Sequence, residues 1–247
     1  MIFLRSALFN VAFFLIGFAL TLAGTLVRLV DPDRVLGVAR LWARANLAAL
    51  RVICGIRLEV TGREHLPPGA ALIASNHQSA FDTMVWLTLV PRASYVLKLE
   101  LLRIPLFGKL LTASGMIAVD REGGAAAVRR LLREGDRAVR EARQIVIFPE
   151  GTRSPAGAVL PLQPGVAALA ARTGLPVIPV VTDSGHCWGR RAFRKQPGCI
   201  RLAIHPPLPP GLPRDVLMRR LRQTYMQAPQ AACSPGDNSV GAAVTNL

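Results

Sequence analysis

The pattern of apolar and polar positions divides the chain into an apolar N-terminal segment and a longer region of short alternating runs. No charged residue occurs from Ser6 to Val27, and a helix of that length would extend about 33 Å, enough to cross a hydrocarbon core of about 30 Å. From Val35 to Ile53, apolar and basic residues recur with helical spacing, which is typical of a helix at a membrane surface or against a protein domain. We therefore interpret residues 1–50 as N-terminal membrane-anchoring helices.

A cleaved signal peptide is the alternative interpretation of the first segment, because Arg5 precedes an apolar stretch. The run is long for such a signal, and no clear Ala-x-Ala cleavage site follows it. Basic residues flank it on both sides, so the sequence leaves open whether it spans the bilayer or lies in one leaflet. We expect the protein at the inner (cytoplasmic) membrane, with its catalytic domain facing the cytoplasm.

Residues 51–227 alternate apolar runs with amphipathic stretches, which predicts a single α/β domain with a mixed, mainly parallel sheet flanked by helices. Pro179 lies inside one of the apolar runs and predicts an edge position or a bulge for that strand. The tail 228–247 contains much Ala, Gly, Ser and Pro, and we expect it to be disordered. Strands are expected at 57–60, 70–74, 95–97, 116–119, 144–147, 177–181 and 200–204, and the longer helices at 125–143, 163–172 and 214–227.

A polar heptad, residues 76–82, separates two apolar runs and contains His77 and Asp82. We expect His77 on the loop that leaves a strand and Asp82 in the first turn of the next helix. There the carboxylate can accept a hydrogen bond from one imidazole nitrogen, so that the other nitrogen can act as a general base. An isolated pair with this spacing is more often a loop histidine and a first-turn acid, so a second signal is needed.

The second signal is the block from Phe148 to Ser154, which follows the predicted strand 144–147. Pro149 ends the strand, and Gly151 allows the backbone to turn tightly. Arg153 offers a planar guanidinium suited to a phosphate or a carboxylate.

With these two blocks, the sequence resembles the glycerolipid acyltransferase family, and most closely its bacterial 1-acyl-sn-glycerol-3-phosphate acyltransferases (lysophosphatidic acid acyltransferases). The resemblance covers roughly residues 51–207. The other matching pieces are Lys98-Leu99-Glu100-Leu101, Ile104-Pro105-Leu106-Phe107-Gly108, Gly115-Met116-Ile117 with Asp120-Arg121, and Leu175-Pro176-Val177-Ile178-Pro179-Val180.

The resemblance implies transfer of a fatty acyl group from acyl-CoA or acyl carrier protein to the sn-2 hydroxyl of 1-acyl-sn-glycerol-3-phosphate, giving phosphatidic acid. It implies no cofactor beyond the acyl donor. His77 would be the base and Asp82 its orienting group. Arg153 would hold the acceptor's phosphate, helped by Lys98, for which a solvated surface lysine is the alternative. The remaining pocket residues implied are Glu150, Gly151 and Thr152.

The charge balance points to anionic lipid rather than nucleic acid as a partner. Lys and Arg number 30 against 15 Asp and Glu, a net charge of +15, and 51% of the residues are hydrophobic. Such a chain suits an anionic membrane surface. Aromatic residues make up only 6%, and no helix-turn-helix, zinc-finger or RNP-like pattern occurs. The four cysteines lack Cys-x-x-Cys spacing, so we expect no metal site and a reducing compartment.

The sequence leaves three other functions to consider, and it does not decide the role of one further segment. The acceptor could be another lysolipid, such as a lyso-ornithine lipid. A membrane esterase would use Ser79, but no Gly-x-Ser-x-Gly elbow occurs. A lipid-binding protein without activity is disfavoured because His77 and Asp82 are both present. The basic and aromatic segment 184–197 is similar to one in a branch of the family and is either a headgroup contact or an ordinary loop.

Overall fold

The computed structural model describes residues 1–120 and 123–227, and the tail that we expect to be disordered lies outside these residues. A seven-stranded sheet forms its centre, in the order β1-β7-β6-β2-β5-β3-β4. All neighbouring strands are parallel except β6 and β7, as the sequence predicts. The strands are β1 (Ile56–Thr61), β2 (Ala71–Ser75), β3 (Ala93–Lys98), β4 (Ile117–Val119), β5 (Gln144–Ile147), β6 (Val177–Thr182) and β7 (Gly198–Ile204).

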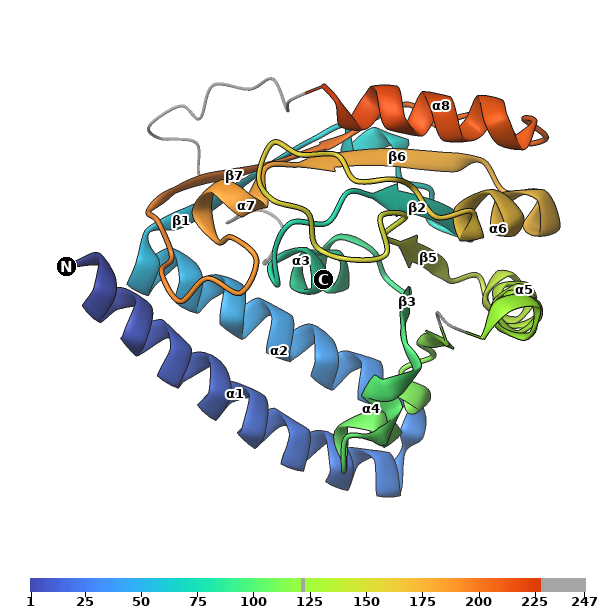
Figure 1. Ribbon diagram of the computed structural model, residues 1–247. Coiled ribbons are helices and arrows are strands. Elements are labelled where there is room, and N and C mark those ends of the chain that lie inside the picture. The colour runs from blue at the N-terminus through green and yellow to red at the C-terminus, as the bar shows by residue number, and fades with distance from the viewer. Residues whose placement is uncertain (121–122, 228–247) are drawn as a thin grey trace.

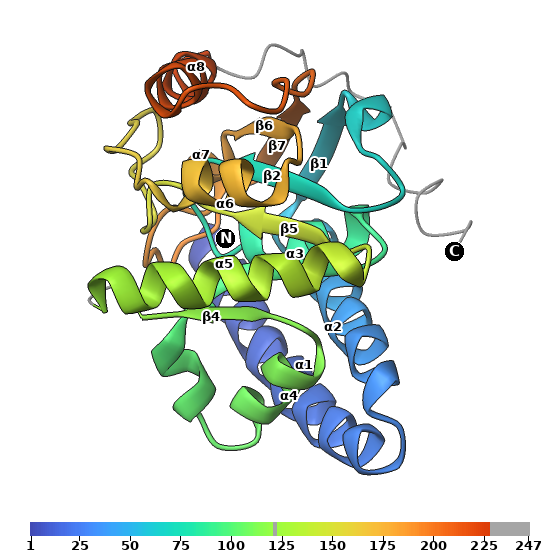
Figure 2. The ribbon, with the colours of Figure 1, turned by 90° about the vertical axis from the view of Figure 1, so that its right-hand side faces the viewer.

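Helices cover both faces of the sheet and give three layers (Figures 1 and 2). The first three helices lie on one face, and α5, α6 and α8 lie on the other. The helices are α1 (Ile2–Val30), α2 (Val35–Ala49), α3 (Asp82–Leu89), α4 (Phe107–Ala113), α5 (Gly124–Arg140), α6 (Gly165–Thr173), α7 (Ser184–Cys187) and α8 (Arg214–Tyr225), with a π-helical end to α2 (Leu50–Cys54) and 3₁₀ turns at Pro32–Arg34, Arg63–His65 and Leu99–Arg103.

Two apolar cores lie on the two faces of the sheet, because successive side chains of a strand point to opposite faces. In β2, Ile73 joins the core that contains Phe9 and Trp86. Its neighbour Leu72 joins the core that contains Leu169 on the other face. Strands covered on both faces need apolar residues at every position, which explains why β2 reads as one continuous apolar run.

Pro179 lies in β6 between β7 and β2, so the predicted edge position is wrong. The ladder with β7 ends at Val180 and Ile204, and pairing resumes between Val177 and Leu208. Ile178 and Pro179 of β6 therefore lie opposite the three residues 205–207. This is a β-bulge, the second possibility that the sequence predicts, and the extra residue lies in the segment that follows β7. The missing N–H of proline falls opposite this irregular stretch, and Pro179 still accepts the N–H of His205 at 2.9 Å.

Helix α1 is, within the part of the chain that the structure describes, the one helix long and apolar enough to cross a membrane. Its outer face is open, with Phe14 71% exposed. Its inner face packs on α2 and on the α/β domain, where Ser6, Phe9 and Gly24 are buried. The N-terminal segment is therefore one wall of the folded protein and not a detached extension.

Candidate active site

Three neighbouring parallel strands, β2, β5 and β3, bring the predicted polar residues to one edge of the sheet. His77 follows β2, Arg153 follows β5, and Lys98 ends β3. The carboxyl ends of parallel strands meet at the same edge, where α/β proteins commonly bind their ligands. Segments far apart in the sequence therefore converge on one site.

His77 and Asp82 lie as the sequence predicts, on the loop after β2 and at the first residue of α3. The imidazole Nδ1 is 2.9 Å from Asp82 Oδ2. The same oxygen accepts the backbone N–H groups of Gln78 and Ser79, each at 2.8 Å. The Asp82 side chain is 2% exposed and that of His77 12%. The carboxylate is thus fixed on the Nδ1 side, which leaves Nε2 for a substrate proton.

Glu150 lies in a different place from the one that the sequence suggests. Its carboxylate is buried and does not line the cavity described below. Instead it accepts hydrogen bonds from the backbone N–H groups of His77 at 2.9 Å and Leu160 at 3.0 Å. The Ser154 hydroxyl is 3.4 Å away. Burial raises the pKa of Glu150, although these hydrogen bonds and His77 oppose the shift. Glu150 therefore positions the backbone that carries His77.

Phe148 is a site residue to which sequence reasoning gives no role. Its ring stacks on the imidazole of His77, with centroids 4.2 Å apart and planes inclined by 20°. Tyr95 stacks behind it at 6.3 Å. An aromatic residue directly after β5, one position before Pro149, is the signal that could have identified it. The stacking restrains rotation of the imidazole about its hydrogen bond to Asp82.

The loop of His77 is also tied to the segment that follows β6. Asn76 donates to the carbonyl of Thr182 at 3.0 Å and accepts its N–H at 2.7 Å. Gln78 accepts the N–H of Gly185 at 3.0 Å. These contacts align the ends of β2 and β6, so that the loop after β6 reaches the same site.

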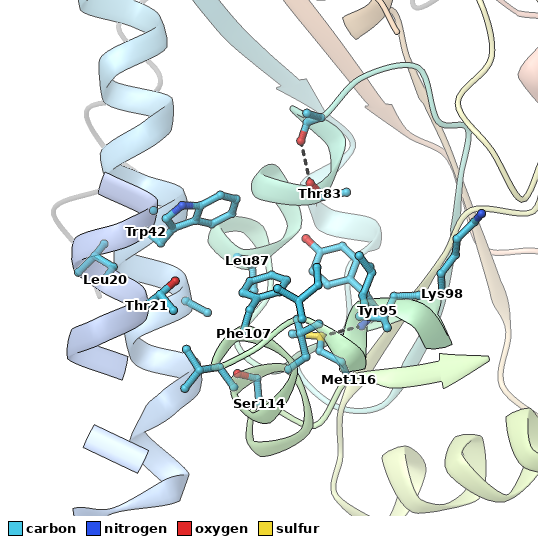
Figure 3. A pocket seen from close by; sticks show the side chains of 18 of the residues that line it. Leu20, Thr21, Trp42, Thr83, Leu87, Tyr95, Lys98, Phe107, Ser114 and Met116 are labelled. Atoms are coloured by element: carbon cyan, nitrogen blue, oxygen red, sulfur yellow. Dashed lines mark hydrogen bonds between the residues drawn. The ribbon is translucent and has the colours of Figure 1, made fainter. Parts of the chain in front are cut away.

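A cavity of about 1080 Å³ begins at His77 and runs between the N-terminal helices and the edge of the sheet. Lys98, Gly151, Thr152 and Arg153 line it together with His77. Away from this polar end the wall is mostly apolar. In Figure 3, Leu20 of α1 and Trp42 of α2 face a group of side chains from the catalytic domain across the cavity: Leu87, Tyr95, Phe107 and Met116.

Basic side chains gather at the polar end of the cavity. Burial lowers the pKa of Arg153; the positive charge of Arg190 lowers it further, and Asp82 opposes both. Arg190 and Arg191, from the loop after α7, line the same cavity. The sequence places both only within the basic segment 184–197, and the approach of Arg190 to Arg153 depends on the strand order.

Comparison with known proteins places these features in a family. An acyltransferase family model matches residues 57–183, which include both sequence blocks. The chain is 38% identical over 169 residues to the 1-acyl-sn-glycerol-3-phosphate acyltransferase of Pseudomonas aeruginosa, covering 68% of this chain and 66% of that protein. It is 31% identical over 192 residues to 1-acyl-sn-glycerol-3-phosphate acyltransferase alpha of Homo sapiens, covering 74% and 67%.

The matched region is shorter in a plant relative. The 1-acyl-sn-glycerol-3-phosphate acyltransferase of Limnanthes alba is 36% identical over 157 residues, which span 62% of this chain and 55% of the relative. Among solved structures, the crystal structure of the 1-acyl-sn-glycerophosphate (LPA) acyltransferase of Thermotoga maritima superimposes with a TM-score of 0.73. It covers 92% of this chain and 95% of its own at 23% identity, so the two proteins share a fold.

Proposed function

The chain belongs to the acyltransferase family, and from this premise we propose that it transfers a fatty acyl group from an acyl thioester to the sn-2 hydroxyl of 1-acyl-sn-glycerol-3-phosphate, giving phosphatidic acid. The observation that carries the proposal is the His77–Asp82 pair at 2.9 Å, which opens on a cavity with Arg153 and Lys98 at its polar end. A lysophospholipid combines the same two chemistries, an anionic phosphate and an apolar chain.

In the proposed mechanism, His77 Nε2 takes the proton of the acceptor hydroxyl as that oxygen attacks the thioester carbonyl. A carbon–oxygen bond forms, and the carbon–sulfur bond then breaks. The thiolate leaves as a thiol after the imidazolium returns the proton. Asp82 Oδ2 stabilises the imidazolium while it exists. The hydroxyl attacks directly, so the reaction needs no acyl-enzyme.

Arg153 and Lys98 would bind the acceptor's phosphate by charge-assisted hydrogen bonds. Binding there holds the hydroxyl against His77 and removes part of the entropic barrier. The apolar wall formed by Leu20, Trp42 and Phe107 would take an acyl chain, because ligand sites bury most of an apolar ligand and fix it with few polar groups.

A serine esterase is not supported by the geometry of Ser79. Its side chain is fully buried, and its Oγ accepts the N–H of Phe81 at 3.2 Å. A nucleophilic serine needs access to the substrate and a base within hydrogen-bond reach. Among the described residues, Ser79 Oγ makes its hydrogen bond to Phe81 and none to His77.

We also propose that the protein works at the inner (cytoplasmic) membrane, with its catalytic domain on the cytoplasmic side and with anionic lipids as partners for its net charge of +15. The apolar outer face of α1 supports membrane association. Because α1 is also a wall of the cavity, a lysophospholipid could enter from the lipid phase without crossing water.

The test is an assay of the purified full chain in detergent micelles. We expect phosphatidic acid from 1-acyl-sn-glycerol-3-phosphate with acyl-CoA, acyl carrier protein thioester or both, and at least about 100-fold slower formation with His77→Ala. A parallel arm offers a lyso-ornithine lipid with the same donors. Turnover of that lipid without turnover of 1-acyl-sn-glycerol-3-phosphate would keep the reaction and overturn the proposed acceptor.

A further inference from the structure

The loop after α7 carries two arginines to the cavity that holds His77 and Arg153. It leaves β6, the neighbour of β2 in the sheet. The loop is therefore next to the His77 loop, on the side away from β5. Arg153 comes from the loop after β5, and Arg190 comes from the loop that follows β6 and α7. The two arginines therefore reach the cavity from different segments of the chain.

The tip of this loop is a tight turn with an unusual backbone conformation. The N–H of Ala192 donates to the carbonyl of Gly189 at 3.1 Å, which closes a β-turn around Arg190 and Arg191. Arg191 has a φ of 56°, in the left-handed region that favours glycine. Unfavourable conformations that the surrounding structure enforces are found preferentially at functional sites.

The base of the loop is fixed to the N-terminal helix. Lys195 is only 2% exposed, and its backbone N–H donates to Ser6 Oγ at 2.9 Å. Its ammonium donates to Asn10 Oδ1 and lies over the ring of Trp188, 4.9 Å from the centroid. The base of the loop is thus held by α1, while Arg190 and Arg191 at its tip are exposed at the mouth of the cavity.

The charges at the cavity suit a doubly charged anion. A phosphate monoester carries a charge of about −1.5 to −2 at neutral pH, more than one guanidinium neutralises. The positive charge of Arg190 contributes to lowering the pKa of Arg153, so the two side chains repel one another until an anion lies between them. Lys98 lines the same cavity from β3.

We propose that Arg190 is a second phosphate-binding residue, which forms with Arg153 a two-arginine clamp for the phosphate monoester of the acceptor. The clamp rests on the proposed function and deepens it, because it assigns selectivity to one position. A phosphodiester headgroup with a quaternary amine carries one negative and one positive charge. Such a headgroup neutralises one arginine at most and repels the other, so the clamp favours a phosphate monoester.

The test compares Arg190→Ala and Arg190→Lys with Arg194→Ala in the full chain. Arg194 is an exposed arginine of the same loop that does not line the cavity. Arg194→Ala therefore changes the net charge by the same amount as Arg190→Ala. We expect Arg190→Ala to raise the KM for 1-acyl-sn-glycerol-3-phosphate about tenfold, the lower end for a lost charge-assisted hydrogen bond. The kcat and the KM for acyl-CoA should stay within about twofold of wild type.

Two comparisons separate the clamp from a general charge effect. Arg190→Lys should recover most of the affinity, and Arg194→Ala should match wild type. The preference for 1-acyl-sn-glycerol-3-phosphate over lysophosphatidylcholine, measured as a ratio of kcat/KM values, should fall in Arg190→Ala only.

Three outcomes would overturn the clamp: an unchanged acceptor KM in Arg190→Ala, an equal rise in Arg194→Ala, or a rise confined to the KM for acyl-CoA, which would assign Arg190 to a phosphate of the donor. A wild-type protein that acylates no phosphate-bearing acceptor would instead overturn the proposed function, and the clamp with it.

Discussion

Glu150 Oε2 accepts a hydrogen bond from the backbone N–H of His77 at 2.9 Å, across 73 positions of sequence. The carbonyl of His77 accepts the N–H of Ser154 at 2.7 Å. Both backbone polar groups of the proposed base are therefore held by the turn that carries Arg153. A displacement of the turn that carries Arg153 would therefore also displace His77.

Replacing Glu150 with Gln should impair catalysis although Glu150 lies outside the cavity lining. An amide has one acceptor oxygen, so its NH₂ group would face either the N–H of His77 or that of Leu160. We expect kcat to fall about tenfold or more, because small displacements of a catalytic group are costly. The thermal midpoint should also fall. Glu64→Gln, at an exposed position, is the control, and an unchanged kcat in Glu150→Gln would remove its positioning role.

His77 and Asp82 should behave as one unit in kinetics. His77→Ala should lower kcat by about 10²- to 10⁴-fold, the usual contribution of a general base, with little change in either KM. Asp82→Asn keeps the shape of the side chain but can donate where the carboxylate accepts, so it should lose most activity. The double variant should be scarcely worse than His77→Ala. If folded, membrane-bound His77→Ala retains a tenth of wild-type turnover, His77 is not the base.

Arg153→Ala should weaken binding of the lysophospholipid far more than binding of the acyl donor. A lost charge-assisted hydrogen bond corresponds to about 1.5–3 kcal/mol, or about 10- to 150-fold in KM. Steady-state kinetics with each substrate varied in turn gives the two values. Arg129→Ala, an exposed arginine of α5, controls for net charge. Equal increases in both KM values would place Arg153 outside the phosphate site.

His205 should make the protein less stable in mild acid. Burial, and then the charge of His65, lowers the pKa of His205 below 6.5. Between that lowered pKa and 6.5, the unfolded chain binds more protons than the native protein, so stability rises with pH there and is lost as the pH falls. The thermal midpoint should drop between about pH 7.5 and about pH 5.5, and less so in His205→Asn.

The control for this measurement is His186→Asn, at an exposed histidine, which should keep the wild-type slope. Identical slopes in wild type and His205→Asn would show that His205 does not contribute to the acid sensitivity. Both variants must be compared in the same detergent, because a ligand or lipid bound to the native state shifts the midpoint.

Local sequence patterns predict much of this site, because the positions of His77, Asp82, Lys98 and Arg153 depend mainly on residues close to them in the sequence. The apolar run before His77 predicts β2, and the spacing to Asp82 predicts the hydrogen bond at 2.9 Å. Lys98 and Arg153 each follow a predicted strand, so their common edge follows from a parallel sheet.

The features that sequence reasoning misses depend on which strands are neighbours. The burial of Glu150 under His77 requires β5 beside β2, and the approach of Arg190 requires β6 on the other side. Periodicity predicts strands but not their order. The edge position predicted for Pro179 is wrong for the same reason, since the irregular partner at residues 205–207 comes from another segment of the chain.

The hydrogen bond between Ser6 and Lys195 joins residues 189 positions apart, which orders events during synthesis. At about 5–20 residues per second, Ser6 leaves the ribosome about 10–40 s before Lys195. During that interval α1 can meet α2, but the loop that later anchors it does not yet exist. For a protein anchored in the membrane as proposed, the bilayer covers the apolar outer face of α1 first. The rest of the chain then assembles against a helix that is already in lipid.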